Sequence, residues 1–154
     1  MSFTVLLCTD GSDLAAAALE HGLDVLRPTD RVVIATVIDS VDPMLVTGTG
    51  MAGGVMSTSE LEILQRDRED AAAQLITSTR ERLGVPEAEG KVLAGAAGPQ
   101  LVELATELSA SVIVLGTRGH GGLRRAVLGS VSDHVIRHAP CPVVTSTREA
   151  SPTE

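Results

Sequence analysis

Residues 116–130 read GTRGHGGLRRAVLGS and are unlike the rest of the chain. Five of these fifteen residues are glycine, three are arginine and none is acidic, although the chain of 154 residues has a formal net charge of -8. Glycine permits positive φ angles and close approach of the backbone to a ligand, so Gly119, Gly121 and Gly122 could turn successive N–H groups inward as an anion nest. The alternative is a flexible surface loop whose arginines serve solubility.

The flanking residues favour the anion site. VIVLG at 112–116 predicts a strand, and a helical pattern begins near Ser130. The first N–H groups of a helix and the positive end of its dipole favour a phosphate, and we expect the Ser130 and Ser132 hydroxyls to be additional donors. Arg118 lies close to the strand end, whereas the other two arginines are expected to face solvent.

Short apolar runs rich in β-branched residues recur along the whole chain. Their hydrophobicity is continuous rather than alternating, which is typical of parallel strands covered on both faces. They lie at 3–8, 32–38, 112–116 and 142–146, with a weaker one at 91–94. The helices between them are expected after N-cap Ser12 as far as Pro28, over Ser59–Leu83, over about 99–109 and from near Ser130 to Pro140. Because parallel strands need crossover connections, this order predicts an α/β fold with a five-stranded open parallel sheet and helices on both faces.

The carboxyl ends of the strands are the expected ligand edge. In open parallel sheets, ligands bind beyond these ends, where the winding direction reverses. Three tripeptides should meet there, namely Cys8-Thr9-Asp10, Val37-Ile38-Asp39 and Gly116-Thr117-Arg118. Cys8 ends one strand and Cys141 precedes another, so the two thiols should lie at opposite ends of the sheet, too far apart for a disulfide.

Composition limits the location and the partners. The length suits one domain, and Phe3 is the only Phe, Tyr or Trp, so the core must be aliphatic. The apolar run at 3–8 has no basic residue before it and is ended by Asp10, so we expect a cytoplasmic protein without a membrane partner. An acidic chain without an aromatic platform also argues against nucleic acid as a partner.

Residues 40–58 form a long stretch without clear periodicity. It contains GTGMAG at 48–53, a formal match to the dinucleotide fingerprint G-x-G-x-x-G. The glycines do not lie in the first strand-to-helix turn, so the match is weak. We favour a mobile flap over the crevice or an oligomer contact for this stretch.

The spacing Gly116-x2-Gly119-x9-Gly129-Ser130 resembles the ATP-binding signature of the universal stress protein family. The flanking sequence LGSVSDHVIRHAPCPVV is similar to the carboxy-terminal helix and strand of that family. TDGS after the first strand and TVID at the end of the second extend the similarity over nearly the whole chain. The resemblance implies one domain over 1–147 with the Rossmann-like, adenine-nucleotide α-hydrolase-like three-layer fold, followed by a disordered tail at 148–154.

The resemblance also implies a nucleotide site. Main-chain groups near Cys8 and Val37 would hold adenine between the first two strand ends, and Asp10 would lie near the ribose or a phosphate-bound metal. Gly116 would border the ribose. The backbone of four residues would cradle the phosphates, namely Gly119, Gly129, Ser130 and Val131; Thr9, Arg118 and Ser132 complete the predicted set. The implied ligand is ATP, or AMP or cyclic AMP, with Mg²⁺ as the expected metal. The family often has proline where Cys8 stands, a departure that matters little for a main-chain contact.

The remaining candidate residues point less clearly to chemistry. His134 and His138 have the i, i+4 spacing of helical metal ligands, but no third ligand sits at a matching place, and we interpret them as ordinary helix residues. His21 reads as part of a solvated face, and His120 could contact a ligand or face water. Cys8 could be a redox thiol, but a buried strand-end cysteine is usually an inert small hydrophobe.

No catalytic residue is assigned. The Walker motif G-x-x-x-x-G-K-[ST] and the nucleophile elbow G-x-S-x-G are both absent, and Lys91 is the only lysine. We therefore expect a nucleotide-binding regulatory or stress-response protein that at most hydrolyses ATP slowly. The alternatives are a genuine nucleotide-hydrolysing enzyme of the α-hydrolase type and a nucleotide-free interaction module. The strand CPVVTST is expected to pair with its copy in a homodimer, and an unidentified protein partner could read the state of the site.

Overall fold

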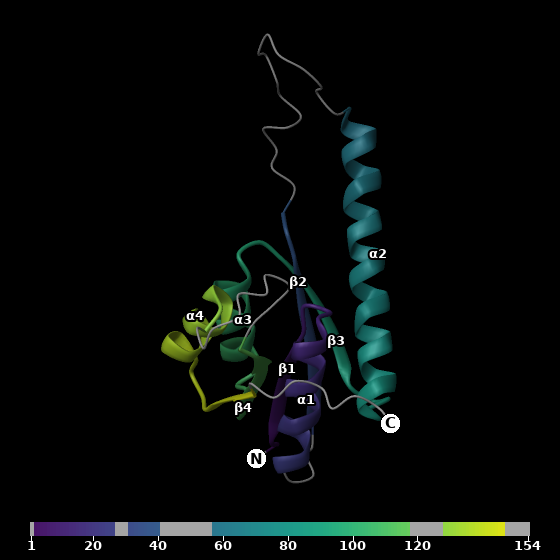
Figure 1. Cartoon of the computed structure of the whole chain (residues 1–154). Helices are drawn as coiled ribbons and strands as arrows, with labels where there is room; N and C mark the ends of the chain where they lie inside the picture. Colours follow the sequence, from purple (N-terminus) through teal and green to yellow (C-terminus); the bar gives the residue numbers. More distant parts are fainter. Residues whose placement is uncertain (1, 27–30, 41–56, 118–127, 147–154) are drawn as a thin grey trace.

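A computed structural model of the chain describes residues 2–26, 31–40, 57–117 and 128–146. Strands and helices alternate in this part of the chain, as the sequence predicts (Figure 1). In order they are β1 (Thr4–Cys8), α1 (Asp13–Val25), β2 (Arg31–Ile38), α2 (Thr58–Leu83), β3 (Glu89–Ala94), α3 (Ala97–Glu107), β4 (Val112–Gly116), α4 (Ser130–His138) and β5 (Val143–Ser146).

The strands form one parallel sheet in the order β3-β2-β1-β4-β5. β1 lies in the middle, where Leu7 pairs with Ile34 of β2 on one side and with Val114 of β4 on the other. The chain therefore builds the sheet outward through β2 and β3, returns to the other side of β1 with β4, and ends with β5. This confirms the predicted open parallel sheet, and the winding direction reverses between β1 and β4.

Helices cover both faces of the sheet, which explains the continuous hydrophobicity of the strands (Figure 1). On one face, α1 and α2 pack against the side chains of Val5 and Leu7. On the other face, α3 and α4 pack against Leu6 and Cys8. Both cores are aliphatic, as expected for a chain with one aromatic residue of the Phe, Tyr and Trp group.

The helix ends follow local sequence signals. The Ser12 hydroxyl caps α1 by accepting a hydrogen bond from Ala15 N at 3.1 Å. α2 begins with a capping box in which Ser57 and Glu60 satisfy each other's backbone N–H groups, one residue before the start that we predicted. It ends at Gly84, whose φ of 63° is the left-handed conformation that glycine adopts without penalty.

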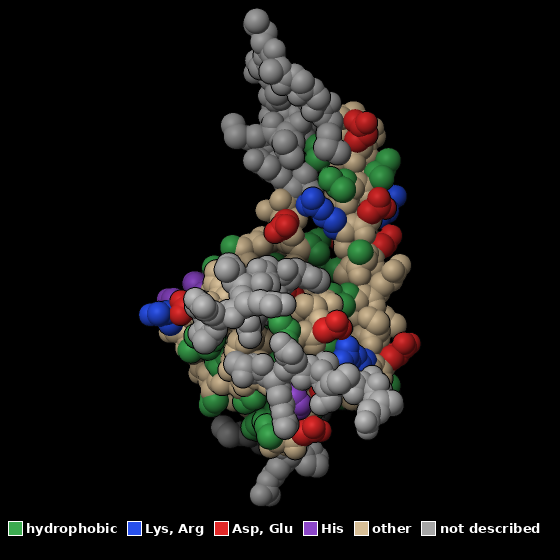
Figure 2. All heavy atoms as spheres, in the orientation of Figure 1, with side chains coloured by type: hydrophobic (Ala, Val, Ile, Leu, Met, Phe, Trp, Pro, Cys, Tyr) green, Lys and Arg blue, Asp and Glu red, His purple; other side chains and the backbone are tan. Residues whose placement is uncertain are grey.

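The long helix α2 is only partly packed on the sheet. Its amino-terminal half extends beyond the strand ends (Figure 1), and charged side chains of both signs lie along its outward side (Figure 2). The apolar stripe that we predicted for it is correspondingly incomplete, because its buried residues are Leu61, Ala72, Ile76 and Thr79. Periodicity alone overestimated its burial.

Candidate functional site

The carboxyl ends of β1 and β4 lie side by side at the point where the winding reverses. Cys8 pairs with Leu115, so Thr9 and Asp10 follow β1 next to the Gly116–Thr117 end of β4. β2 lies on the other side of β1, and Thr9 N donates to Ala35 O at 3.0 Å. The structure therefore brings three predicted strand ends to one edge of the sheet, with Val37 two residues beyond the level at which β1 and β2 last pair.

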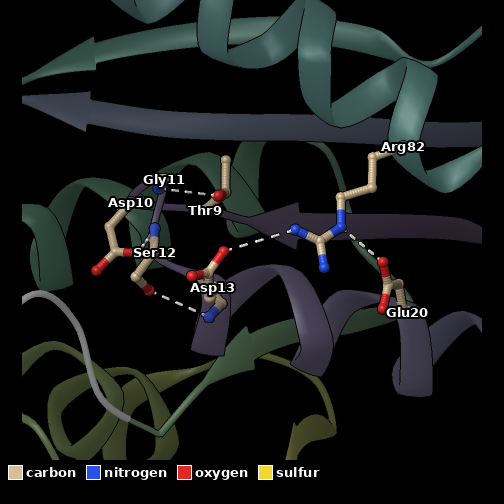
Figure 3. Close-up of polar contacts among 8 residues, drawn as sticks. Thr9, Asp10, Gly11, Ser12, Asp13, Glu20 and Arg82 are labelled. Atoms are coloured by element: carbon tan, nitrogen blue, oxygen red, sulfur yellow. Dashed lines mark hydrogen bonds and ion pairs between the residues drawn. The ribbon is translucent and has the colours of Figure 1, made fainter. Parts of the chain in front are cut away.

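The loop between β1 and α1 uses its own side chains to satisfy its backbone (Figure 3). Gly11 N donates to Thr9 Oγ1 at 3.1 Å, and Ser12 N donates to Asp10 Oδ1 at 2.9 Å. Gly11 has a φ of 83°, a conformation that favours glycine and that reverses the chain into the helix. The N–H groups of Gly11 and Ser12 are thus engaged within the loop, and the Asp10 and Asp13 carboxylates add negative charge.

The guanidinium group of Arg82, at the end of α2, is directed to α1 (Figure 3). Its Nε donates to Glu20 Oε1 at 2.6 Å, and its Nη1 lies 3.8 Å from Asp13 Oδ1. Arg82 therefore links the two helices on this face of the sheet. The sequence carried no signal for this contact, because the residues are far apart in the chain.

The start of α4 is built differently from the start of α1. Its N-cap is Gly129, which has no side chain to cap the helix, and no side-chain hydrogen bond replaces it. Gly129 N donates to Thr117 O at 2.8 Å, which ties the start of the helix to the end of β4. Within the residues described, no acceptor lies on the backbone N–H groups of Ser130, Val131 and Ser132, which are the first three of the helix.

The Ser132 hydroxyl, which we predicted to be a donor to phosphate, makes hydrogen bonds within the protein. The side chain is buried, and Ser132 Oγ donates to Thr117 O and Gly129 O, both at 2.9 Å. The single hydroxyl proton is therefore directed into the protein rather than toward a ligand. The sequence missed this because it does not indicate that the end of β4 lies against the first turn of α4. Ser130 and Val131 are exposed at the same helix end.

Cys8 is a buried thiol. Burial raises its pKa to about 12, and the charge of Cys141 acts in the same direction. Burial also raises the pKa of Cys141. Both cysteines are free, and Cys141 precedes β5 at the amino end of the sheet whereas Cys8 lies at the carboxyl end. A thiol that stays protonated suits the inert role expected for Cys8.

Several predicted residues lie outside the described part of the chain. These are Arg118, Gly119, His120, Gly121, Gly122, Arg124 and Arg125, together with GTGMAG at 48–53 and the tail at 148–154. The His134 and His138 rings stack with centroids 4.3 Å apart, and His138 Nδ1 lies 2.8 Å from His134 O. Among the described residues, no cluster of three or more His, Cys, Asp or Glu is placed to hold a metal ion. No described helix has the length and hydrophobicity needed to cross a bilayer.

The sheet order and its covered faces define an α/β protein with the Rossmann-like, adenine-nucleotide α-hydrolase-like fold. The model of the universal stress protein family matches residues 1–146. A universal stress protein of Methanocaldococcus jannaschii is 33% identical over 140 residues, which cover 91% of this chain and 79% of the relative. This chain belongs to the universal stress protein family.

Solved structures agree on the fold. Hypothetical protein MJ0577, whose biochemical function was assigned from its structure, superposes with a TM-score of 0.75 at 22% identity, covering 98% of this chain and 99% of that chain. A universal stress protein crystallised in complex with cAMP has a TM-score of 0.64 at 22% identity, covering 97% and 98% of the two chains. A universal stress protein family member from Arabidopsis thaliana with AMP bound has a TM-score of 0.59 at 17% identity, covering 99% and 95%.

Proposed function

We propose that this protein binds an adenine nucleotide at the carboxyl edge of the sheet, with the phosphates at the amino end of α4, and acts as a regulatory nucleotide sensor in a stress response. The observation that carries this proposal is the contrast between two helix ends at one edge. The first N–H groups of α4 have no acceptor among the described residues, whereas the β1–α1 loop and the start of α1 are capped by side chains. Two structural neighbours hold cAMP and AMP, which supports an adenine nucleotide as the ligand.

Electrostatics favour α4 over α1 as the phosphate site. The first N–H groups of α4, which have no acceptor among the described residues, and the positive end of its dipole attract an anion. The acidic residue in its first turn, Asp133, is paired with Arg137 at 2.9 Å. At the start of α1, the carboxylates of Asp10 and Asp13 would repel one, and the Ser12 hydroxyl already accepts a hydrogen bond from Ala15 N. A phosphate chain entering this edge would therefore turn toward Gly129, Ser130 and Val131.

The other predicted contacts complete the proposed site. Backbone groups near Cys8, Thr9 and Val37 would hold the adenine, and Gly116 would border the ribose. Arg118 and Gly119 remain proposed phosphate contacts on the sequence alone. Asp10 is exposed at the strand end, so its carboxylate could contact the ribose or a Mg²⁺ ion brought by ATP.

Binding rather than fast turnover is the proposed output. Enzymes of the α-hydrolase class need a pyrophosphate loop after the first strand, and here the N–H groups of Gly11 and Ser12 are already taken by Thr9 and Asp10. This arrangement favours the sensor over the hydrolase. Hydrolysis, where it occurs, is expected to be slow.

Isothermal titration with ATP, AMP, cyclic AMP and adenosine, with and without Mg²⁺, tests the proposal. We expect ATP to bind and adenosine to bind more weakly, because the phosphates supply the anion contacts. An absence of heat with all four ligands would favour the nucleotide-free module. Phosphate release faster than about one per second at excess ATP, the low end of typical enzyme rates, would favour the enzyme.

The assembly and the boundaries of the protein are part of the proposal. β5 is an edge strand of the described sheet, and a groove of about 360 Å³ between α1 and β5 runs along it, lined by His21, Val25, Val144 and neighbouring residues. We propose that β5 pairs with its copy in a homodimer, since an uncovered edge tends to be paired. Sedimentation that detects only monomer at micromolar concentration would contradict this.

We also propose one domain over 1–147, a disordered tail at 148–154 and a cytoplasmic location.

A further inference from the structure

We infer that Ser132 is a positioning residue whose buried hydroxyl holds the end of β4 against the first turn of α4, and thereby orients the N–H groups that receive phosphate. This inference rests on the proposed function for its link to phosphate. The contact itself rests on the structure. Ser132 is 3% exposed, and its Oγ lies 2.9 Å from both Thr117 O and Gly129 O.

The three residues form a closed set of hydrogen bonds. Thr117 O accepts from Gly129 N at 2.8 Å and also from the Ser132 hydroxyl. Gly129 O accepts from Asp133 N at 2.9 Å, the first bond of the helix, and also from the Ser132 hydroxyl. The hydroxyl is the only side-chain donor in this set, so it connects two backbone segments that, among the described residues, are otherwise joined by the Gly129 N–H group.

The position of these bonds relates them to the proposed site. Thr117 directly follows β4, and Gly129 directly precedes α4, so the bonds fix where the helix axis starts relative to the sheet edge. The next residues, Ser130 and Val131, carry N–H groups without an acceptor among the described residues. An anion contact weakens steeply when its donors are misaligned, so loosening this connection would affect phosphate more than adenine.

Ser132→Ala removes the hydroxyl and leaves the backbone intact. We expect the affinity for ATP to fall about tenfold, and the affinity for adenosine to change less than twofold, in isothermal titration. A residue that merely supports the fold would weaken both ligands alike. Ser78→Ala is the control, because it removes an exposed serine hydroxyl of α2 that lies outside the proposed site and donates to Leu75 O within its own helix.

A second measurement does not depend on nucleotide. We expect the Gly129 amide to exchange with solvent at least tenfold faster in Ser132→Ala than in the wild-type protein, with the amides of β1 unchanged, as measured by NMR. Equal protection of Gly129 in both proteins would overturn the inference, and so would equal loss of ATP and adenosine binding. If wild-type protein binds no nucleotide but Gly129 exchange responds, the proposed function fails and the positioning contact stands. Should Ser132→Ala fail to fold, Ser132→Cys keeps the side-chain size with a much weaker donor and serves the same two measurements.

Discussion

At the scale of single residues, Gly129 matters because it places no side chain at the N-cap of α4. Its φ of -66° and ψ of 159° are open to any residue, so no backbone strain requires glycine there. Because the N-cap of α4 is glycine, its own side chain cannot cap the helix, in contrast to Ser12 at α1 and Ser57 at α2. Among the described residues, the first N–H groups of this helix are thus left without an acceptor.

Gly129→Asp should therefore stabilise the helix and abolish binding. An aspartate at this N-cap would accept from the first N–H groups of α4, and its charge would repel phosphate. We expect the melting temperature to stay equal or rise, and the affinity for ATP to fall at least tenfold in isothermal titration. Gly129→Ala is the control without a capping group. Unchanged ATP affinity in the aspartate variant would show that phosphate does not bind at this helix end.

Cys8 gives a prediction for alkaline stability. Its folded pKa of about 12 lies above the ordinary thiol value of 9.0, so the folded chain holds this proton more tightly than the unfolded chain does. Its contribution is fully present below about pH 9 and is lost as the pH rises from there toward about 12. We expect the free energy of unfolding to fall by about 1 kcal/mol from this group between pH 8 and pH 10. Urea unfolding at these two pH values measures the change. The free energy of unfolding should fall less between pH 8 and pH 10 in Cys8→Ala than in the wild-type protein, and an equal fall in both would contradict the raised pKa of Cys8.

At the scale of elements, one close approach positions α1 on the sheet. A Cβ built on Gly22 would lie 2.3 Å from Val114 Cγ1, closer than atoms can pack, so α1 can lie this near β4 only with glycine at this position. Because α1 directly follows the loop after β1, the position of α1 on the sheet also affects the position of Thr9 and Asp10 at the sheet edge.

Gly22→Ala should accordingly destabilise the protein by about 1–3 kcal/mol, which is the usual cost of overpacking. Thermal unfolding followed by circular dichroism measures it. The paired test is Val114→Ala with and without Gly22→Ala, since removing the two methyl groups makes room for the new one. An equal cost in both backgrounds would mean that contact with Val114 is not the cause.

At the scale of the whole molecule, ligand binding should be visible as stability. A ligand that binds only the folded state stabilises it by about 2.7 kcal/mol at a concentration of one hundred times Kd. We expect ATP to raise the melting temperature of the wild-type protein with a logarithmic dependence on concentration. The Gly129→Asp protein should show no such rise, and an equal rise in both would indicate a binding site elsewhere.

Most of the fold could be predicted from the sequence, because burial on both faces of a parallel sheet leaves continuous apolar runs and helices leave a periodic pattern. The ends of α1 and α2 were close to the predicted ones, since Ser12 and Gly84 act on neighbouring backbone groups. The packing of α2 was predicted less well, because periodicity does not report where the sheet ends. Of the site, the residues at the strand ends could be named, but not which of their polar groups were already engaged.

The sequence by itself determined the alternation of strands and helices, the aliphatic core and the strand ends that meet at the carboxyl edge, since all of these depend on local pattern and on the rule that parallel strands share one edge. Only the tertiary structure decided that the amides of Gly11 and Ser12 are satisfied by Thr9 and Asp10, and that the Ser132 hydroxyl bonds to Thr117 and Gly129. It also decided that the first N–H groups of α4 have no acceptor among the described residues. The physical reason is that a hydrogen bond depends on the distance and angle between two groups, and the fold brings these groups together across chain separations that a pattern of residue types does not encode.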